Sequence, residues 1–278
     1  MPASGAKGSQ PSRIASLRNA FGSFRLHHIL WSALDMLLPP ACAGCGKPGF
    51  RWCCECQQSV RRLPEPLCSI CGVPIRSSDS VCAHCLRVRP AYRALRSWSV
   101  FAAPIRPALH HLKYRRDIGL GEALALQLAG FVKGLQWPVD GVTPVPLGRR
   151  RQRERGYNQA SLIARPLSMA IGAEYVPSAV VRIRDTRTQV GLTRLARQEN
   201  VRGAFGAAPD IVRGRVLLLV DDVATTGATL SACAQALLVS GARDVLALTV
   251  ARAYPDGHHL GLQGTHAAQA GRSWEEAM

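Results

Sequence analysis

Residues 216–229 read VLLLVDDVATTGAT, and this stretch decides the fold. Its first five residues are leucine and β-branched valine, a run that is typical of a strand buried on both faces of a parallel sheet. Asp221 and Asp222 follow, where such a strand ends and where open α/β sheets bind ligands. Small residues then lead into an apolar run from Leu230 to Val239, which indicates a helix. The stretch therefore predicts a strand, an acidic edge, a loop and a helix in succession.

The loop after the two acids has the composition of a phosphate-binding site. It consists of small residues only, namely Ala224, Thr225, Thr226, Gly227, Ala228 and Thr229. A ligand can therefore approach the backbone N–H groups closely, and Gly227 can adopt angles that other residues avoid. A helix that begins near Ala228 would direct its unpaired N–H groups and the positive end of its dipole at the same place. We expect a phosphate to bind there; the alternative is an ordinary strand-to-helix turn with acidic capping residues.

Asp221 and Asp222 supply acceptors for sugar hydroxyls beside that loop. Carboxylates also hold divalent cations, in part through water. Because successive residues of a strand point to opposite faces, we do not expect the two carboxylates to act as one dyad. If the chain turns at this point, both can bind one vicinal diol. The sequence thus predicts that hydroxyl acceptors and phosphate donors lie side by side.

Nine of the ten cysteines lie between residues 42 and 85, and eight of them form four C-x-x-C pairs. The pairs are Cys42/Cys45, Cys53/Cys56, Cys68/Cys71 and Cys82/Cys85. Four pairs supply two sets of four thiolates, which is the ligand set of structural Zn²⁺. The simpler assignment puts the first two pairs on one ion and the last two on the other, and an interleaved assignment is the alternative.

Two other chemistries fit this spacing, a disulfide framework and iron–sulfur ligation. We expect no secretory signal peptide before the cysteines, which favours zinc. The segment is short and poor in apolar residues, so metal binding is expected to supply its folding free energy. A chelator is then expected to unfold it and to leave the later domain largely intact. Cys54, which is adjacent to a better-spaced ligand, is expected to be a spectator, and Cys233 is expected to pack in the helix after the phosphate loop.

The chain is strongly basic, with a formal net charge of +17 and an isoelectric point near 10.3. Such an excess attracts polyanions. The most crowded basic run is RRRQRER, which contains Arg149, Arg150, Arg151, Arg153 and Arg155. Guanidinium groups form paired hydrogen bonds with phosphate, so this run predicts contact with pyrophosphate or a nucleic-acid backbone. A solvated basic surface is the alternative.

The order of segments predicts an α/β fold in which a parallel-sheet domain follows a small Cys-rich module. We expect a partly disordered extension over 1–33, the zinc module over 34–90, the α/β domain over 91–254 and a disordered tail over 255–278. The expected strands are 97–102, 139–145, 176–183, 216–220 and 245–250. The expected helices are 105–114, 120–135, 159–171 and 228–239. Residues 14–38 are expected to form a surface helix, and a cleavable targeting peptide is the alternative. No apolar run reaches the length that we expect of a membrane span.

Six motifs in this order resemble the ComF (competence protein F) family. They are LLPPACAGCG at 37–46, HHLKYRRD at 110–117, PVPL at 144–147, RQRERGYNQA at 151–160, TQVGLTRLARQENVRGAF at 188–205 and the stretch at 216–229. The resemblance covers about residues 34–252. It implies a double zinc ribbon joined to a domain of the type I phosphoribosyltransferase kind. It also implies a bacterial cytoplasmic protein that handles single-stranded DNA during natural transformation.

The resemblance also implies roles for individual residues. Asp221 and Asp222 would bind the ribose hydroxyls of phosphoribosyl pyrophosphate, with Mg²⁺, and Ala224 to Thr229 would bind its 5′-phosphate. The 6-oxopurine transferases carry Asp where this chain has Thr225, which argues against a hypoxanthine or guanine substrate. PVPL and Arg149 to Arg155 would lie on the pyrophosphate side. Residues 188–202 would form a mobile flap, in which Gln189, Arg197 and Asn200 match the family pattern.

Two functions fit these features. The first is a ComF-like protein that binds phosphoribosyl pyrophosphate or a related sugar phosphate and handles single-stranded DNA during DNA uptake. The second is an active phosphoribosyltransferase of nucleotide metabolism whose acceptor base the motifs do not identify. A zinc-ribbon adaptor with a vestigial binding site is a third reading, and the complete loop argues against it.

Overall fold

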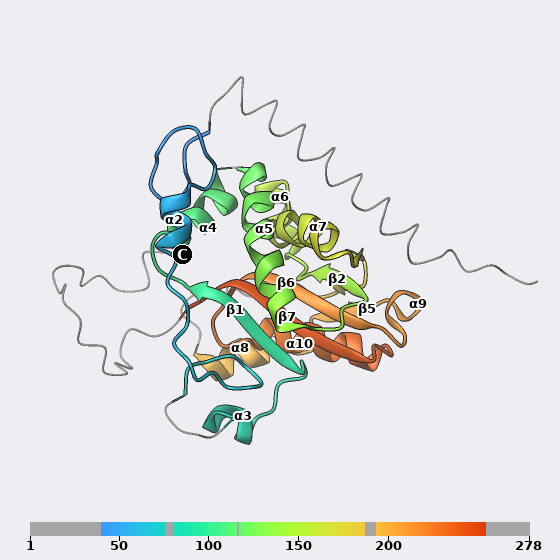
Figure 1. Ribbon diagram of the computed structural model, residues 1–278. Coiled ribbons are helices and arrows are strands. Elements are labelled where there is room, and N and C mark those ends of the chain that lie inside the picture. The colour runs from blue at the N-terminus through green and yellow to red at the C-terminus, as the bar shows by residue number, and fades with distance from the viewer. Residues whose placement is uncertain (1–39, 76–79, 116, 187–192, 254–278) are drawn as a thin grey trace, which may run out of the picture.

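A five-stranded parallel sheet forms the centre of the computed structural model, which describes residues 40–75, 80–115, 117–186 and 193–253 (Figure 1). The strand order is β1-β7-β6-β2-β3. The strands are β1 (Ala94–Val100), β2 (Gly141–Pro144), β3 (Glu174–Tyr175), β6 (Val216–Ala224) and β7 (Asp244–Arg252). The predicted α/β fold with a parallel sheet is therefore confirmed.

Strand β6 lies in the middle of the sheet, as its apolar run predicts. Residues Val216 to Val220 are at most 3% exposed, because helices cover both faces of a central parallel strand. The strand runs on through both acids to Ala224, which is further than the expected end at Val220. Strand β2 ends at Pro144, opposite Val220, so the acids extend past the end of that neighbour. The edge of the sheet therefore has a step, and Asp221 and Asp222 lie beyond the end of β2.

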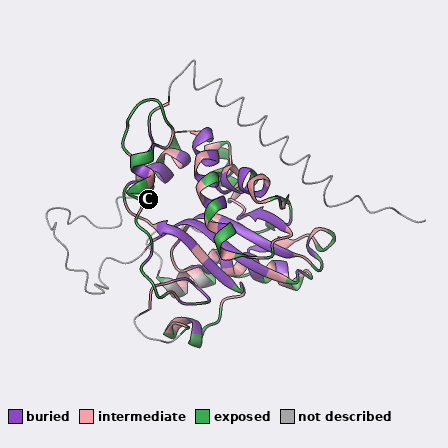
Figure 2. Ribbon diagram, in the orientation of Figure 1, coloured by how far each residue is buried: buried purple, intermediate pink, exposed green. Residues whose placement is uncertain are grey.

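Three helices cover one face of the sheet and two cover the other (Figure 1). The first face carries α4 (Ile105–Tyr114), α5 (Ile118–Leu135) and α7 (Gln159–Ile171), and the second carries α8 (Arg194–Val201) and α10 (Ala228–Val239). Leu218 and Val220 pack in the core of the first face, and Leu217 and Leu219 pack in that of the second. Figure 2 shows the resulting buried band along the strands.

The remaining described helices are short and lie outside these layers. They are α2 (Cys54–Gln58) and α3 (Ala83–Arg87) in the Cys-rich segment, α6 (Arg149–Arg155) after β2, and α9 (Pro209–Val212) before β6. The basic run RRRQRER is thus helical. It begins after Gly148 and ends at Gly156, whose φ of 80° closes the helix in the left-handed region.

The strand expected over 176–183 does not join the parallel sheet. Only its second half forms a strand, β4 (Val180–Arg182), which pairs antiparallel with β5 (Phe205–Ala207) in a separate two-stranded sheet. Val181 and Ile183 are 45% and 65% exposed, so this two-stranded sheet is not covered on both sides. Residue patterning identified an extended segment correctly but could not identify its partner strand, which depends on contacts distant in sequence.

Some predictions fall where the structure gives no description. The extension 1–33, the helix over 14–38 and the tail from 255 lie outside the described residues. Within the described ranges, α5 is the one helix whose length and composition would suit a bilayer, and half of it is buried in the fold. It packs against α7 and the sheet, as a core helix of a parallel α/β fold does.

Candidate functional site

Asp222 is buried in an ion pair at the carboxyl end of β6. Its Oδ2 lies 2.6 Å from Nζ of Lys113, near the end of α4, and its side chain is 7% exposed. Burial alone would raise the pKa of Asp222, but the Lys113 ammonium outweighs it, and a hydrogen bond from Gln159 adds to that effect. The net result is a pKa below the usual aspartate value. Asp222 is therefore an ionised acceptor at neutral pH.

Asp221 lies near Cys233 of α10, which packs on the other face of the sheet from α4, and its side chain also interacts with that of Asp222. Burial of the Cys233 thiol in α10 raises its pKa, and the nearby negative charge of Asp221 raises it further. Burial and the neighbouring charge of Asp222 raise the pKa of Asp221 well above its usual value. The Asp222 N–H also donates to Asp221 Oδ1 at 2.9 Å. The two carboxyl groups thus interact across the strand and differ in character.

The predicted phosphate loop lies directly beyond the acids. Ala224 ends β6, Thr225 to Gly227 form the connection, and Ala228 and Thr229 begin α10. The Ala228 N–H donates to Thr226 Oγ1 at 3.3 Å. Gly227 has a φ of 78°, and a Cβ there would lie 2.8 Å from the Tyr92 hydroxyl oxygen. Glycine is therefore required at this position by backbone angle and by space.

The five predicted arginines of α6 divide into two groups. Arg149, Arg150, Arg151 and Arg153 are exposed, and Arg150 pairs with Glu154 at 2.7 Å. Arg155 instead turns toward the acids: its guanidinium donates to Gln159 Oε1 at 2.8 Å and stands 5.1 Å from the centre of the Tyr114 ring. The first group presents positive charge to solvent, and the last belongs to the network around Asp222.

Two residues of that network, Lys113 and Gln159, were not identified by sequence reasoning. Both lie in motifs that carry the family resemblance, HHLKYRRD and RQRERGYNQA, so their position in these motifs was the available signal. The two motifs meet where Tyr157 Oη donates to the Leu112 carbonyl at 2.6 Å. In addition, Asn158 Nδ2 donates to the Val145 carbonyl at 2.9 Å, which fixes the start of α7 against the end of β2. These contacts place Gln159 beside the acid.

The eight predicted metal ligands form two clusters in sequential order. Each set has all four Sγ atoms within 4.8 Å of one another: Cys42, Cys45, Cys53 and Cys56 in one, Cys68, Cys71, Cys82 and Cys85 in the other. Individual Sγ–Sγ distances are 3.6 Å and 3.7 Å. Tetrahedral Zn²⁺ with Zn–S bonds of about 2.3 Å requires about 3.8 Å between sulfurs. The clusters therefore fit Zn²⁺, and the sequential pairing is confirmed over the interleaved one.

The two other cysteines have the expected places. Cys54 is exposed and lies outside the clusters, and Cys233 is fully buried in α10. Of the predicted flap residues, Gln189 lies outside the described residues, while Arg197 and Asn200 lie on α8. Arg184 donates to the Asn200 carbonyl at 3.1 Å, which ties α8 to the chain after β4.

Comparison with known proteins agrees with the motif order. The family described as the double zinc ribbon domain matches residues 33–86. The DNA utilization protein YhgH of Escherichia coli K12 is 35% identical over 219 residues, which are 76% of this chain and 96% of that protein. Competence protein F of Haemophilus influenzae is 30% identical over 72% of this chain and 90% of its own length. The chain belongs to the ComF family. Competence protein ComFC of Bacillus subtilis is 28% identical over 81% and 90%.

Solved structures give a more distant likeness to this ComF-family chain. Adenine phosphoribosyltransferase of Saccharomyces cerevisiae is 19% identical, with a TM-score of 0.32 over 49% of this chain and 70% of that one. The glutamine phosphoribosylpyrophosphate amidotransferase of Bacillus subtilis is 20% identical, with a TM-score of 0.34 over 47% and 26%.

Proposed function

We propose that this ComF-family protein binds phosphoribosyl pyrophosphate, or a related sugar phosphate, where β6 meets α10. One observation carries the proposal: an ionised, buried Asp222 and its neighbour Asp221 stand next to a loop of small residues that opens a twelve-residue helix. The carboxyl groups would accept hydrogen bonds from the ribose hydroxyls, and the N–H groups of the loop and of the first turn of α10 would bind the 5′-phosphate.

Mg²⁺ belongs to the same proposal. Pyrophosphate carries several negative charges, and Asp222 adds another at the sheet edge, so a divalent cation would be needed to reduce the repulsion. The Lys113 ammonium already neutralises Asp222 from the α4 side. The cation would therefore act mainly on the pyrophosphate, and the side of the site that carries Arg155 would complete its neutralisation.

Titration calorimetry tests the binding function directly. We expect phosphoribosyl pyrophosphate to bind the full-length, zinc-loaded protein with one-to-one stoichiometry, and more tightly with Mg²⁺ than in Mg²⁺-free buffer that contains no chelator. Ribose 5-phosphate, which has no pyrophosphate, should bind more weakly. No heat from either ligand at millimolar concentration would contradict the proposal.

Transferase activity needs an acceptor base in addition. The motif residues at 216–229 do not specify one, and Thr225 stands where 6-oxopurine enzymes use Asp. Consumption of phosphoribosyl pyrophosphate with a panel of nucleobases would show whether this site also catalyses transfer. Without turnover, the function is binding.

A second proposed function is the binding of single-stranded DNA by α6. Two observations favour it: Arg149, Arg151 and Arg153 are exposed, and the relatives are named for DNA utilization and competence. Arginines that contact phosphates release counterions from DNA, so such binding depends steeply on salt. Because metal-bound thiolates persist in a reducing compartment, we propose that the protein acts in the cytoplasm.

Replacing Arg149, Arg151 and Arg153 together with Ala is expected to weaken binding to single-stranded DNA roughly 10- to 100-fold and to flatten its salt dependence. Fluorescence anisotropy with a labelled oligonucleotide, repeated at several salt concentrations, measures both. The matched control replaces Arg61, Arg106 and Arg213, which are also exposed but lie outside α6. Equal losses in the two variants would mean that net charge, and not α6, drives the binding.

A further inference from the structure

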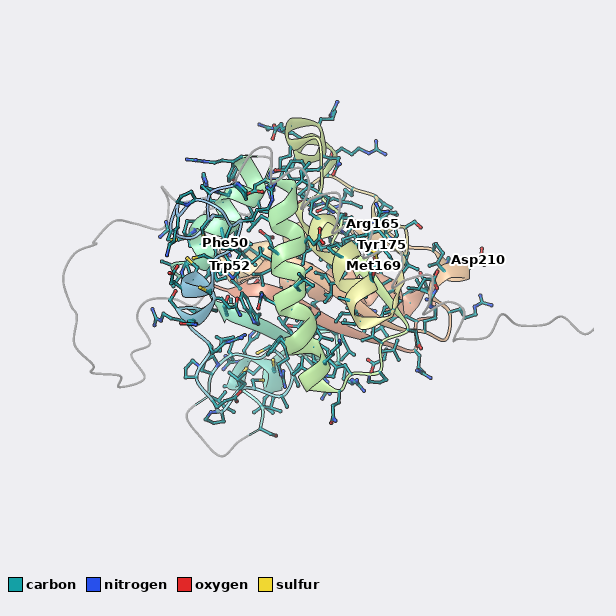
Figure 3. All side chains as sticks on the ribbon, turned by 45° about the horizontal axis from the view of Figure 1, so that its top comes forward. Phe50, Trp52, Arg165, Met169, Tyr175 and Asp210 are labelled. Atoms are coloured by element: carbon teal, nitrogen blue, oxygen red, sulfur yellow. The ribbon has the colours of Figure 1, made fainter. Side chains whose placement is uncertain are left out.

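The two cysteine clusters have different surroundings. Cys42, Cys53 and Cys56 of the first form a small buried group, and the neighbouring Ala43 and Trp52 pack against the core on the face of the sheet that α4, α5 and α7 cover. Cys68, Cys71 and Cys85 of the second belong to the core on the other face of the sheet, together with Leu217 and Leu219 of β6 and the buried residues of α10. Figure 1 shows α2 of the first cluster on the side of α4, and α3 of the second on the side of α8. Figure 3 shows Phe50 and Trp52 of the first ribbon across α5 from Arg165 and Met169 of α7.

The backbone of the second cluster is bonded directly to the sheet. The Leu95 N–H of β1 donates to the Ile70 carbonyl at 2.7 Å. A Cβ at Gly72 would lie 2.5 Å from the Leu95 carbonyl oxygen, so the C-x-x-C turn presses against the strand. This turn therefore has no space to shift toward the sheet, and its shape and the position of β1 are linked.

Arg252 connects the second cluster to the end of β6. Its guanidinium is buried, at 3% exposure, and donates to the Cys71 carbonyl at 2.6 Å. In the sheet, Arg252 pairs in register with Ala224, the last residue of β6 before the phosphate loop. The next residue continues the link, because the Ala253 N–H donates to the Ala224 carbonyl at 2.9 Å. A buried arginine thus joins a cysteine loop to the start of the candidate binding loop.

Tyr92 makes a second connection between the second cluster and the phosphate loop. It is 1% exposed, packs in the core that includes Cys68, Cys71 and Cys85, and places its hydroxyl against Gly227. The preceding N–H, of Ala91, donates to Ser231 Oγ at 3.0 Å, in the first turns of α10. The chain that leaves the second cluster therefore touches both the loop and the helix that follows it.

We propose that the second cysteine cluster positions the phosphate loop through Tyr92 and Arg252, so that a metal ion in this cluster controls anion binding there, whereas the first cluster has no such effect. The inference rests on the proposed function for its consequence in binding. The physical reason is that the described residues around these four cysteines, 68–75 and 80–85, form short segments whose order is expected to depend on metal ligation. When that segment loses its order, Arg252 and Tyr92 lose the surfaces that hold them, and the loop opens locally.

Loss of metal is therefore expected to have different effects at the two clusters. Loss of metal from the first cluster is expected to affect that ribbon and to leave the loop ordered. Loss of metal from the second is expected to disturb the phosphate loop at the sheet edge as well, because cysteines of that cluster pack in the same core as β6 and α10. Hydrogen exchange in the phosphate loop can therefore distinguish the effect of one cluster from that of the other.

The test compares Cys82→Ser with Cys45→Ser in the full chain, each of which removes one ligand from one cluster. Elemental analysis should find about one zinc per chain in both variants, compared with about two in the wild type. Hydrogen exchange, without ligand, is then followed in peptides that cover residues 225–229. We expect exchange there to rise at least about tenfold in Cys82→Ser and to stay unchanged in Cys45→Ser. Equal exchange in the two variants overturns the proposal.

A second variant covers the case in which Cys82→Ser does not fold. Arg252→Gln leaves every cysteine in place, so both zinc ions should stay bound while exchange at 225–229 still rises. Arg213→Gln, at an exposed position, is the control and should change neither quantity. Unchanged loop exchange in Arg252→Gln, with zinc retained, also overturns the proposal.

The exchange measurement separates this inference from the proposed function. It uses no sugar phosphate, so the link from cluster to loop can be established even if the wild type fails to bind phosphoribosyl pyrophosphate. Conversely, wild-type binding together with an unaltered loop in Cys82→Ser would retain the proposed function and reject the inference.

Discussion

Replacing Asp222 with Asn is expected to weaken the binding of phosphoribosyl pyrophosphate roughly 10- to 100-fold. The carboxylate is the buried, ionised member of the acid pair, held in that state by Lys113 at 2.6 Å. An amide keeps the size of the side chain but replaces one acceptor oxygen by a donor, so a sugar hydroxyl loses a charged partner. Titration calorimetry with Mg²⁺ present measures the change.

The matched control is Asp210→Asn. Asp210 is exposed on α9 and stands at the periphery of the molecule in Figure 3. This substitution makes the same change of charge, and its affinity should equal that of the wild type. If Asp222→Asn binds as tightly as Asp210→Asn, the acid pair is not the sugar-binding element and the proposed function has no basis in this site.

Part of the effect of Asp222→Asn will come from the lysine that it leaves unpaired. Lys113 is only 24% exposed, so an isolated ammonium there is costly. Denaturant unfolding of Asp222→Asn, Lys113→Met and the double variant forms a cycle that isolates this interaction. We expect a coupling of roughly 1–3 kcal/mol, with the double variant more stable than the sum of the single losses indicates. Loss of sugar-phosphate binding in the double variant, at restored stability, then reflects the missing carboxylate itself.

Local sequence was sufficient for the elements in which each residue agrees with its neighbours. The apolar run at 216–220, the acids and the small-residue loop lie next to one another in the chain, and the structure keeps them in that order. The C-x-x-C pairs are likewise local, and sequential pairing needs only a short loop to close. Here periodicity, turn chemistry and ligand spacing all point to the same arrangement.

The parts that sequence reasoning missed are contacts between distant segments. Lys113 meets Asp222 because α4 ends over the carboxyl edge of the sheet, and Arg252 meets the Cys71 carbonyl across 181 positions of sequence. Neither residue type signals such a partner, since arginine and lysine are usually exposed. The β4–β5 pairing was missed for the same reason, because an extended segment does not specify which strand it joins.

Gly227→Ala is expected to destabilise the protein by roughly 2–4 kcal/mol and to weaken sugar-phosphate binding with it. Two costs add. A φ of 78° is unfavourable for any residue with a Cβ, and that Cβ would lie 2.8 Å from the Tyr92 hydroxyl oxygen. Since Tyr92 is 1% exposed and fixed in the core, it cannot move aside, so the loop must shift. Denaturant unfolding measures the first effect and calorimetry the second.

Gly214→Ala separates the two costs. Gly214 has a similar φ of 71°, but no atom lies within 4 Å of its Cβ position, so only the backbone term of roughly 1–2 kcal/mol should remain. The excess cost at Gly227 is then the contact with Tyr92. Tyr92→Phe in the Gly227→Ala background removes the hydroxyl and should recover part of the excess in both stability and affinity. If Gly227→Ala costs no more than Gly214→Ala, the tyrosine does not support the loop, and the link from the second cysteine cluster must run through Arg252 alone.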